Sequence, residues 1–366
     1  KRLYRIGLNL FNRKPNKGID FLLTHKFLDS KPQSIARFLL NRKGLSKQMV
    51  GVYLGDLQRP MNMEVLSHFV NGIDLHNLPI DEALRKFQAY FRLPGEAQKI
   101  ERLMEAFSTS YYNSNPSGTL KNVDTIFLLS YAVVMLNTDL HNRNIKVEKK
   151  MRMEDFVKNL RGIDNGKDVD PGYLSDIYRR ISTCPLKPSN DHVTQVSKVD
   201  AMIAGKKPLL VQPHRRLVCY CRLFEVFDPM LMRKDKDGGR HQRDVFLFND
   251  LLVITKLCNR KKNVLTYNFR ESFPLLHMKI VLFDLPYCPN GMQLVNGCDG
   301  SVLVTFCAKD DGELKKFVSD LNESILEVIS SFISFFRSSF FLFIRSFVRS
   351  VIHTFVRSFV CSFVHS

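Results

Sequence analysis

One acidic residue stands at a rigid corner of a strongly basic chain. In FRLPGEAQKIERL, at residues 91–103, Pro94 and Gly95 directly precede Glu96, and helix-forming residues follow. Glu96 could take part in acid–base chemistry, but no second carboxylate lies at a spacing that would support hydrolysis. The sequence also shows no nucleophile elbow and no phosphate-binding glycine loop. Judged on spacing alone, Glu96 can be explained without any function, because an acid at the start of a helix is stabilised by the positive end of the helix dipole.

The second candidate site is the stretch IFLLSYAVVMLNTDLHN at residues 126–142. A helix that is apolar on every side is typical of the centre of a domain. The alternative is that one side packs in the core while Tyr131, Val134 and Met135 line an exposed groove, which would mark a protein partner. Asp139 and His141 have no third ligand at metal spacing, so we expect a hydrogen-bonded turn there and no metal site.

Helical spacing dominates the first half of the chain, whose segments end at Pro or Gly residues. Predicted helices cover GIDFLLTHKFL, PQSIARFLL, LSKQMVGVYLG, MEVLSHFVNGID, PIDEALRKFQAYF, EAQKIERLMEAFSTSYY, VDTIFLLSYAVVMLNTDLHN, MEDFVKNL and GYLSDIYRRI. Residues 1–188 are therefore predicted to form an all-α domain, and the polar stretch 189–205 is predicted to be a linker.

The apolar period changes to two after the linker, which indicates strands. Predicted strand segments are RRLVCYCRLFEVFD, RDVFLFNDLLVITK, VLTYNFRESF, HMKIVLFDL, GMQLV and SVLVTFCA. An amphipathic helix, ELKKFVSDLNESILEV, follows them, and its inward residues are predicted to be Leu314, Phe317, Val318, Leu321, Ile325 and Val328. Residues 206–330 should thus form a small antiparallel barrel or sandwich with a closing helix.

Composition and net charge limit the possible functions less sharply than these motifs do. The chain has 366 residues and a net charge of +18, which favours polyanionic partners such as nucleic acid, acidic lipid or an acidic protein face. Its cysteines show no zinc spacing, so we expect free thiols in a reducing compartment. No signal peptide is visible, and a start at Lys1 suggests a piece of a longer protein. The tail at 331–366 repeats units such as RSFV. We interpret it as low complexity, from a translated nucleotide repeat or a mis-joined exon, with a lipid-surface segment as the alternative.

Two long stretches resemble a known family. FRLPGEAQKIERLMEAF and LSYAVVMLNTDLHN resemble the signature motifs of the Sec-seven domain, the exchange catalyst for Arf-family GTPases, and KGIDFLLTHKFL, IARFLL and VGVYLGD resemble its earlier helices. Residues 206–330 resemble the pleckstrin-homology (PH) domain that follows the Sec-seven domain in this family. The sequence as a whole most resembles the IQ-motif-containing, BRAG-type subfamily. The resemblance implies a helical Sec-seven domain followed by a PH β-barrel with a C-terminal helix. The tryptophan usual in that helix is absent, and Phe317 is predicted to fill its place.

The resemblance also implies roles for single residues. Glu96 would be the glutamic finger that enters the nucleotide site of GDP-bound Arf, near the magnesium ion and the β-phosphate. Tyr131, Val134 and Met135 would receive the apolar switch regions of Arf, and Asn142 would bond to the Arf backbone. Assistance could come from Arg92, Lys99 and Arg102, for which a solvated helix face is the alternative. No covalent bond would change, so the resemblance predicts an exchange factor that needs no cofactor.

Membrane recruitment is the function that the resemblance implies for the second domain. The predicted phosphoinositide-binding residues lie on or beside two strand-connecting loops: Arg222, Arg233, Lys234, Lys236, Arg240, Arg243, Arg260, Lys261 and Lys262. Each basic residue near an anionic membrane surface contributes about 1 kcal/mol, so such a cluster would suffice for recruitment. We therefore expect a cytoplasmic protein that binds peripherally to the plasma membrane or endosomes. One alternative is a scaffold that binds Arf or lipid without exchanging nucleotide. Nucleic-acid binding is not predicted, because no nucleic-acid module is present.

Overall fold

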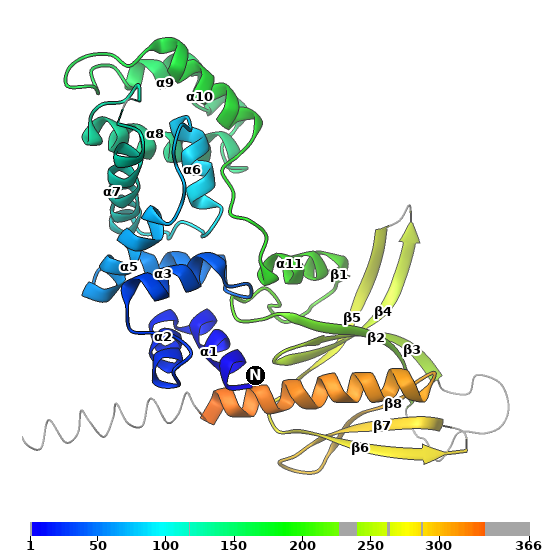
Figure 1. Cartoon of the computed structure of the whole chain (residues 1–366). Helices are drawn as coiled ribbons and strands as arrows, with labels where there is room; N and C mark the ends of the chain where they lie inside the picture. Colours follow the sequence, from blue (N-terminus) through cyan, green and yellow to red (C-terminus); the bar gives the residue numbers. More distant parts are fainter. Residues whose placement is uncertain (1, 117, 227–239, 262–263, 287, 334–366) are drawn as a thin grey trace, which may run out of the picture. The chain divides into compact units, whose positions relative to one another are not determined.

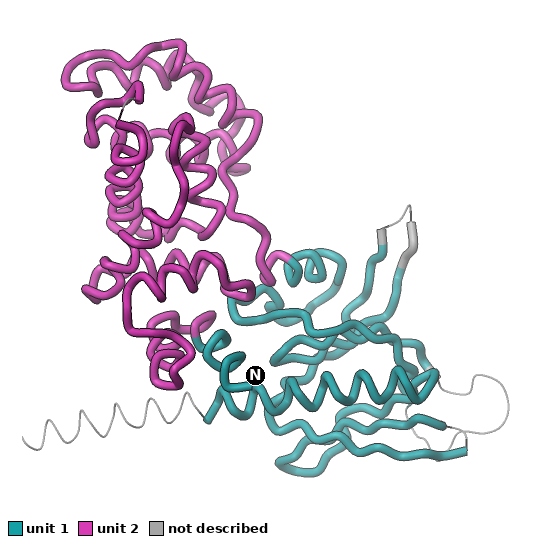
Figure 2. The backbone as a smooth tube through the Cα atoms, in the orientation of Figure 1, with its two compact units in different colours: residues 1–10, 195–366 teal, residues 11–194 magenta. Residues whose placement is uncertain are grey.

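The computed structural model describes residues 2–116, 118–226, 240–261, 264–286 and 288–333. Figure 2 colours the two compact units into which the chain divides. One unit contains residues 11–194 and is helical, and the other contains residues 1–10 and the chain from residue 195 onward. The predicted fold class, an all-α domain followed by a β domain with a C-terminal helix, is confirmed. Most of the predicted tail, from residue 334 onward, lies outside the described residues.

The helical unit consists of α-helices of 7 to 19 residues joined by loops (Figure 1). In chain order they are α2 (Pro15–Thr24), α3 (Pro32–Asn41), α4 (Lys47–Leu54), α5 (Pro60–Asn71), α6 (Ile80–Gln88), α7 (Ala97–Ser114), α8 (Val123–His141), the 3-10 turn η1 (Val147–Lys149), α9 (Met153–Asn159) and α10 (Pro171–Thr183). Every helix predicted from the apolar spacing in residues 1–188 is present.

Proline and capping side chains set where these helices begin. Proline occupies the first turn of α2, α3, α5 and α10, where its missing N–H costs no helical hydrogen bond. At α4, the Ser46 hydroxyl accepts from the backbone N–H of Met49. Aromatic rings fill the interior, and the Phe87 ring lies 4.8 Å from that of Phe91 and 5.3 Å from that of Phe107, centroid to centroid.

Helix α8 is a core helix of this unit. Helices α6, α7 and α10 pack against it, and its buried residues are Thr125, Ile126, Leu129, Ser130, Val133, Val134 and Leu136. By length and composition alone α8 could also cross a membrane. Packing inside the helical unit accounts for the buried part of this apolar composition, while Leu128 and Met135 stay exposed.

The β unit is built on one sheet. Its strands are β1 (Ile203–Ala204), β2 (Leu217–Val226), β3 (Arg240–Phe248), β4 (Leu251–Lys261), β5 (Val264–Pro274), β6 (Met278–Leu285), β7 (Cys288–Asn296) and β8 (Val302–Cys307). Their order in the sheet is β1-β5-β4-β3-β2-β8-β7-β6, and all pairs are antiparallel except β1 with β5. The predicted strand segments are confirmed, and RDVFLFNDLLVITK contains parts of two strands, β3 and β4.

A largely buried carboxylate, that of Asp250, lies in the turn between β3 and β4. Arg215 donates to Asp250 from Nε at 2.8 Å and from Nη2 at 2.9 Å, and His214 Nε2 lies 3.3 Å from the same carboxylate. Burial opposes ionisation of Asp250, but the hydrogen bonds from His214 and Arg215 outweigh it and hold the pKa of this carboxyl well below its usual range.

A helix at residues 311–333 closes the sheet. Leu314, Phe317, Leu321 and Ile325 are buried in the core that it forms with the sheet, and Val318 and Val328 pack against that core. The predicted inward face is therefore confirmed. Phe317 lies in this core, where the sequence predicted that it would fill the place of the absent tryptophan.

The first helix, α1 (Arg2–Arg13), reaches this closing helix. Within the β unit, the side chain of Asn9 donates to the buried carboxylate of Glu327, which also pairs with Arg216 at 2.6 Å and with Arg5 at 3.7 Å. A neighbouring carboxylate, Glu323, pairs with Arg5 at 3.7 Å. The start of α1 is thus tied by charge-assisted hydrogen bonds to residues far along the chain.

The predicted linker contains a helix, α11 (His192–Met202). Val196, Val199 and Ile203 pack with Leu210 against apolar residues of β3, β4 and β5, including Phe246. This part of the chain therefore covers one face of the sheet and is not merely a spacer.

The cysteines differ from the expectation of free thiols at one pair. Cys288 and Cys307 form a disulfide that joins β7 to β8. The prediction is wrong for this pair, whose Cα atoms lie 5.9 Å apart although the residues are 19 apart in sequence, a separation typical of a disulfide. The free cysteines among the described residues are Cys184, Cys219, Cys221, Cys258 and Cys298.

Candidate functional site

The corner that carries Glu96 is anchored to helix α4. The backbone N–H of Arg92 donates to the carbonyl of Lys47 at 2.8 Å. Gly51 permits this approach, because a Cβ there would overlap the carbonyl oxygen of Arg92. The corner follows the buried ring of Phe91, so the chain is fixed immediately before it becomes exposed.

Glu96 itself points into solvent at the N-cap position of α7. Its backbone is extended, with φ −98° and ψ 127°, and its carboxylate makes no capping hydrogen bond. The side chain is 70% exposed, and Lys99 Nζ donates to its Oε1 at 2.7 Å. The acid therefore does not cap its own helix through a side-chain hydrogen bond, although its charge still lies at the positive end of α7.

Helix α8 presents an apolar stripe beside its buried residues. Met135 is 53% exposed, and Tyr131 is half-buried with its ring 6.4 Å from that of Phe127. Val134 is only 7% exposed. We therefore assign Val134 to the core and not to the exposed groove predicted from the sequence, because its position on α8 faces the interior.

One residue of this stripe was missed by the sequence analysis. Leu128 is an exposed large apolar residue, and it lies three and seven positions before Tyr131 and Met135, which is the spacing of one helix face. That spacing was the available signal. In a helix that is apolar all round, however, it does not distinguish the exposed face from the buried one.

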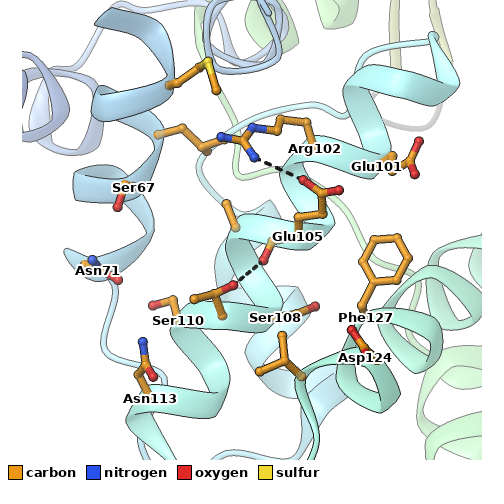
Figure 3. A pocket seen from close by; sticks show the side chains of 15 residues that line it. Ser67, Asn71, Glu101, Arg102, Glu105, Ser108, Ser110, Asn113, Asp124 and Phe127 are labelled. Atoms are coloured by element: carbon orange, nitrogen blue, oxygen red, sulfur yellow. Dashed lines mark hydrogen bonds and ion pairs between the residues drawn. The ribbon is translucent and has the colours of Figure 1, made fainter. Parts of the chain in front are cut away.

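A cavity of about 640 Å³ opens between α5, α7 and the start of α8 (Figure 3). The ring of Phe127 lines it, so the cavity meets the residue that contacts Tyr131. Its other walls mix apolar and polar side chains: Met63, Leu66 and Val123 lie among carboxylates from Glu101, Glu105 and Asp124. Arg102 pairs with Glu105 at 3.1 Å. Because Glu101 and Glu105 lie on α7, the helix that Glu96 precedes also forms part of this wall.

Asp139 and His141, which the sequence predicted to form a hydrogen-bonded turn, instead lie in the last turn of α8 and bond to distant parts of the chain. Asp139 accepts from the backbone N–H of Met151 at 2.7 Å, and the His141 ring lies 2.8 Å from the carbonyl of Ile181. Asn142 is half-buried, and its side-chain oxygen accepts from the N–H of Asn144 at 2.9 Å. Over the described ranges, no group of three or more His, Cys, Asp or Glu side chains is placed to hold a metal ion.

The predicted lipid-binding residues of the β unit divide into three groups. Arg222 on β2 is about half exposed and pairs with Asp244 at 3.3 Å. Arg243 is buried and pairs with Glu225 at 2.6 Å, so its position does not fit a membrane-contacting role. Arg233, Lys234, Lys236 and Lys262 lie outside the described residues, as do the side chains of Arg240, Arg260 and Lys261.

Two family models match the chain. Residues 1–186 match the Sec7 domain, which is the Sec-seven domain of the sequence analysis. Residues 206–330 match a PH domain of the type named for IQ-motif Sec-seven proteins.

Several known proteins are similar to the first of these segments. Brefeldin A-inhibited guanine nucleotide-exchange protein 2 of Arabidopsis thaliana is 42% identical over 195 residues, which cover 52% of this chain and 11% of that protein. Cytohesin-4 of Mus musculus is 44% identical over 186 residues, 51% of this chain and 46% of that protein. A solved structure of ARF1-GDP bound to a Sec7 domain complexed with Brefeldin A is 38% identical, with a TM-score of 0.47, and the match covers 51% of this chain and 93% of that chain.

The chain thus spans less than half the length of either of these curated relatives. The Sec-seven match nevertheless covers residues 1–186 of the 366, and it contains both the Glu96 corner and the apolar stripe of α8. The chain belongs to the Sec-seven-domain family and carries a PH domain after its Sec-seven domain.

Proposed function

We propose that this chain promotes GDP release from Arf-family GTPases by inserting Glu96 beside the bound nucleotide. The observation that carries the proposal is the exposed carboxylate of Glu96, which stands on a backbone corner fixed to α4 and makes no capping bond. Membership of the Sec-seven family supports the reaction class. The Arabidopsis relative is named as a guanine nucleotide-exchange protein, which supports the same reaction class.

Electrostatics gives the size of the effect. A carboxylate forced beside the β-phosphate repels the anion and competes with it for magnesium. At an effective dielectric of about 20, two unit charges about 4 Å apart interact by roughly 4 kcal/mol. Because each 1.4 kcal/mol is about tenfold in an equilibrium, this repulsion can weaken nucleotide binding by a factor on the order of a hundred to a thousand.

Docking must supply the energy that drives this insertion. The exposed stripe of Leu128, Tyr131 and Met135 offers apolar surface for the switch regions of the GTPase. Covering such surface stabilises a complex by about 25 cal/mol per Å². The cavity between α5, α7 and α8 lies next to the stripe through Phe127 and offers carboxylates to basic groups of the partner.

Release of fluorescent GDP from Arf tests the proposal. Glu96→Gln keeps the size of the side chain and removes its charge, so we expect the catalysed rate to fall by about a hundredfold or more. Glu96→Lys should abolish catalysis. The matched control is Glu154→Gln, an exposed acid in the first turn of α9, which should leave the rate unchanged. Wild-type rates in Glu96→Gln would rule the mechanism out.

We infer further that the PH domain recruits the protein to anionic membranes through the basic residues around its strand-connecting loops. The family match and the half-exposed Arg222 support this role, and Arg243 is left out because it is buried. Vesicle flotation with phosphoinositide-containing and neutral lipid tests it. A Lys234→Glu, Lys236→Glu variant should lose about 30-fold or more in affinity, from about 1 kcal/mol for each basic residue.

The control for lipid binding is Lys315→Glu, which changes an exposed lysine of the closing helix outside the predicted set. Equal flotation of the loop variant and wild type would contradict the lipid proposal. Flotation without any acceleration of GDP release by the wild-type chain would instead identify a membrane scaffold.

A further inference from the structure

Helix α4 holds the Glu96 corner from both sides. Before the corner, Gly51 makes room for the backbone of Arg92. After it, Gly55 at the end of α4 faces Lys99, since a Cβ added at Gly55 would lie 3.1 Å from Lys99 Cβ and 3.4 Å from Lys99 Cγ. Glycines one helical turn apart therefore let both ends of the corner approach the same helix closely.

Lys99 connects this contact to the acid. The start of its side chain rests against Gly55, and its Nζ donates to Glu96 Oε1 at 2.7 Å. The Lys99 side chain is 25% exposed, against 70% for Glu96, so the lysine is the better fixed member of the pair. The pair spans three positions at the beginning of α7, where the backbone N–H of Lys99 also donates to the carbonyl of Glu96.

From this geometry we propose that Lys99 is a positioning residue, which holds the carboxylate of Glu96 in one orientation before the GTPase arrives. The proposal rests on the function proposed above for Glu96. A glutamate side chain that rotates freely must be ordered when it inserts, and this ordering adds to the barrier of the exchange step. Lys99 would remove part of that cost in advance, because its own stem is already fixed against Gly55.

Lys99→Met is the test variant, since it keeps an unbranched stem against Gly55 and removes the ammonium group. GDP release is measured over a range of Arf·GDP concentrations so that kcat and KM are separated. We expect kcat to fall about two- to fivefold with KM unchanged, the factor given by a partly exposed ion pair. Lys99→Arg should restore most of kcat, because it can still donate to the carboxylate.

Two readouts separate positioning from a merely structural role. In a Glu96→Asp background the shortened acid can no longer meet Lys99 in the same way, so Lys99→Met should have no further effect on kcat. Raising the salt concentration should also bring wild type toward Lys99→Met, because exposed ion pairs are screened. A packing role would instead give the same loss in both backgrounds and at every salt concentration, and that result would overturn the proposal.

The control is Arg179→Met, which removes a similar pair three positions apart, with Asp176 at 3.2 Å on α10, and should leave kcat unchanged. The outcomes also separate the two proposals. Wild-type exchange in Glu96→Gln would refute the proposed function itself. Loss of exchange in Glu96→Gln together with a wild-type kcat in Lys99→Met would refute only the role of Lys99.

Discussion

Replacing Arg180 should destabilise the helical unit more than replacing its partner, Asp81. The two side chains join α10 to α6 through a two-pronged ion pair, with Nε donating at 2.7 Å and Nη2 at 2.8 Å. Asp81 is fully buried, whereas the Arg180 side chain is 35% exposed. Each substitution leaves the other charged side chain without its partner. The loss in stability is larger when the side chain left unpaired is the more deeply buried one.

The size of each stability loss follows from the unpaired charge that the substitution leaves in the protein. Arg180→Met leaves a buried carboxylate with no cation, a change that typically costs about 3–5 kcal/mol. Asp81→Asn leaves a guanidinium that already reaches water, so the loss is nearer that of a charged hydrogen bond, about 1.5–3 kcal/mol. For a unit of this size about 2–4 °C of Tm corresponds to each kcal/mol, so Arg180→Met should lower Tm by roughly 6–20 °C.

Calorimetry of the whole chain measures the loss, and hydrogen exchange of peptides from α6 and α10 locates it. Arg179→Met is the control, because its pair with Asp176 is exposed on both sides and contributes at most about 1 kcal/mol. Equal Tm losses in Arg180→Met and Asp81→Asn would refute the reasoning from burial. So would a loss in Arg179→Met as large as that in Arg180→Met.

Other perturbations test the β unit and the apolar stripe of α8. The pKa of Asp250 is lowered in the folded protein, so the ionised carboxylate stabilises the fold at pH values above its unfolded pKa. Urea unfolding of the wild type should show this contribution to the free energy of unfolding being lost as the pH falls below about 4. Asp250→Asn should lack this loss. Burial, with Asp320 nearby, raises the pKa of Cys219 to about 12, so at neutral pH iodoacetamide should modify it far more slowly than exposed Cys298, as mass spectrometry of digests would reveal. Met135→Asp should raise KM for Arf by about tenfold or more and change kcat less, because it removes apolar contact and buries a charge; an unchanged KM would exclude the stripe from docking.

The sequence predicted the fold best where a helix or strand has one polar and one apolar face. Strand alternation and the closing-helix stripe predicted the β unit well, and Phe317 occupies the predicted core. Helix α11 was missed because residues 189–205 are polar overall, although Val196, Val199 and Ile203 have the spacing of a buried face. Short amphipathic segments bury too few residues to stand out from a linker by composition.

Whether a side chain at the candidate sites is buried or exposed could not be predicted from the apolar pattern. Helix α8 is apolar all round, so nothing in its pattern distinguishes buried Val134 from exposed Leu128. Arg243 looked like its basic neighbours, but it is buried against Glu225, a pairing that depends on how β2 and β3 lie together. Local sequence gives the charge of such residues, whereas tertiary packing decides whether that charge meets solvent or a partner.

Glu327 has a practical consequence for dividing the protein. A Sec-seven fragment cut at the homology boundary, residue 186, would keep α1 but lose the acid that Asn9 and Arg5 bind. Its amino-terminal turns would then be free to fray or to associate with another molecule. Exchange rates measured on such a fragment would reflect the altered amino-terminal helix as well as the missing PH domain. A fragment extended through residue 333 is therefore the proper reference for either domain.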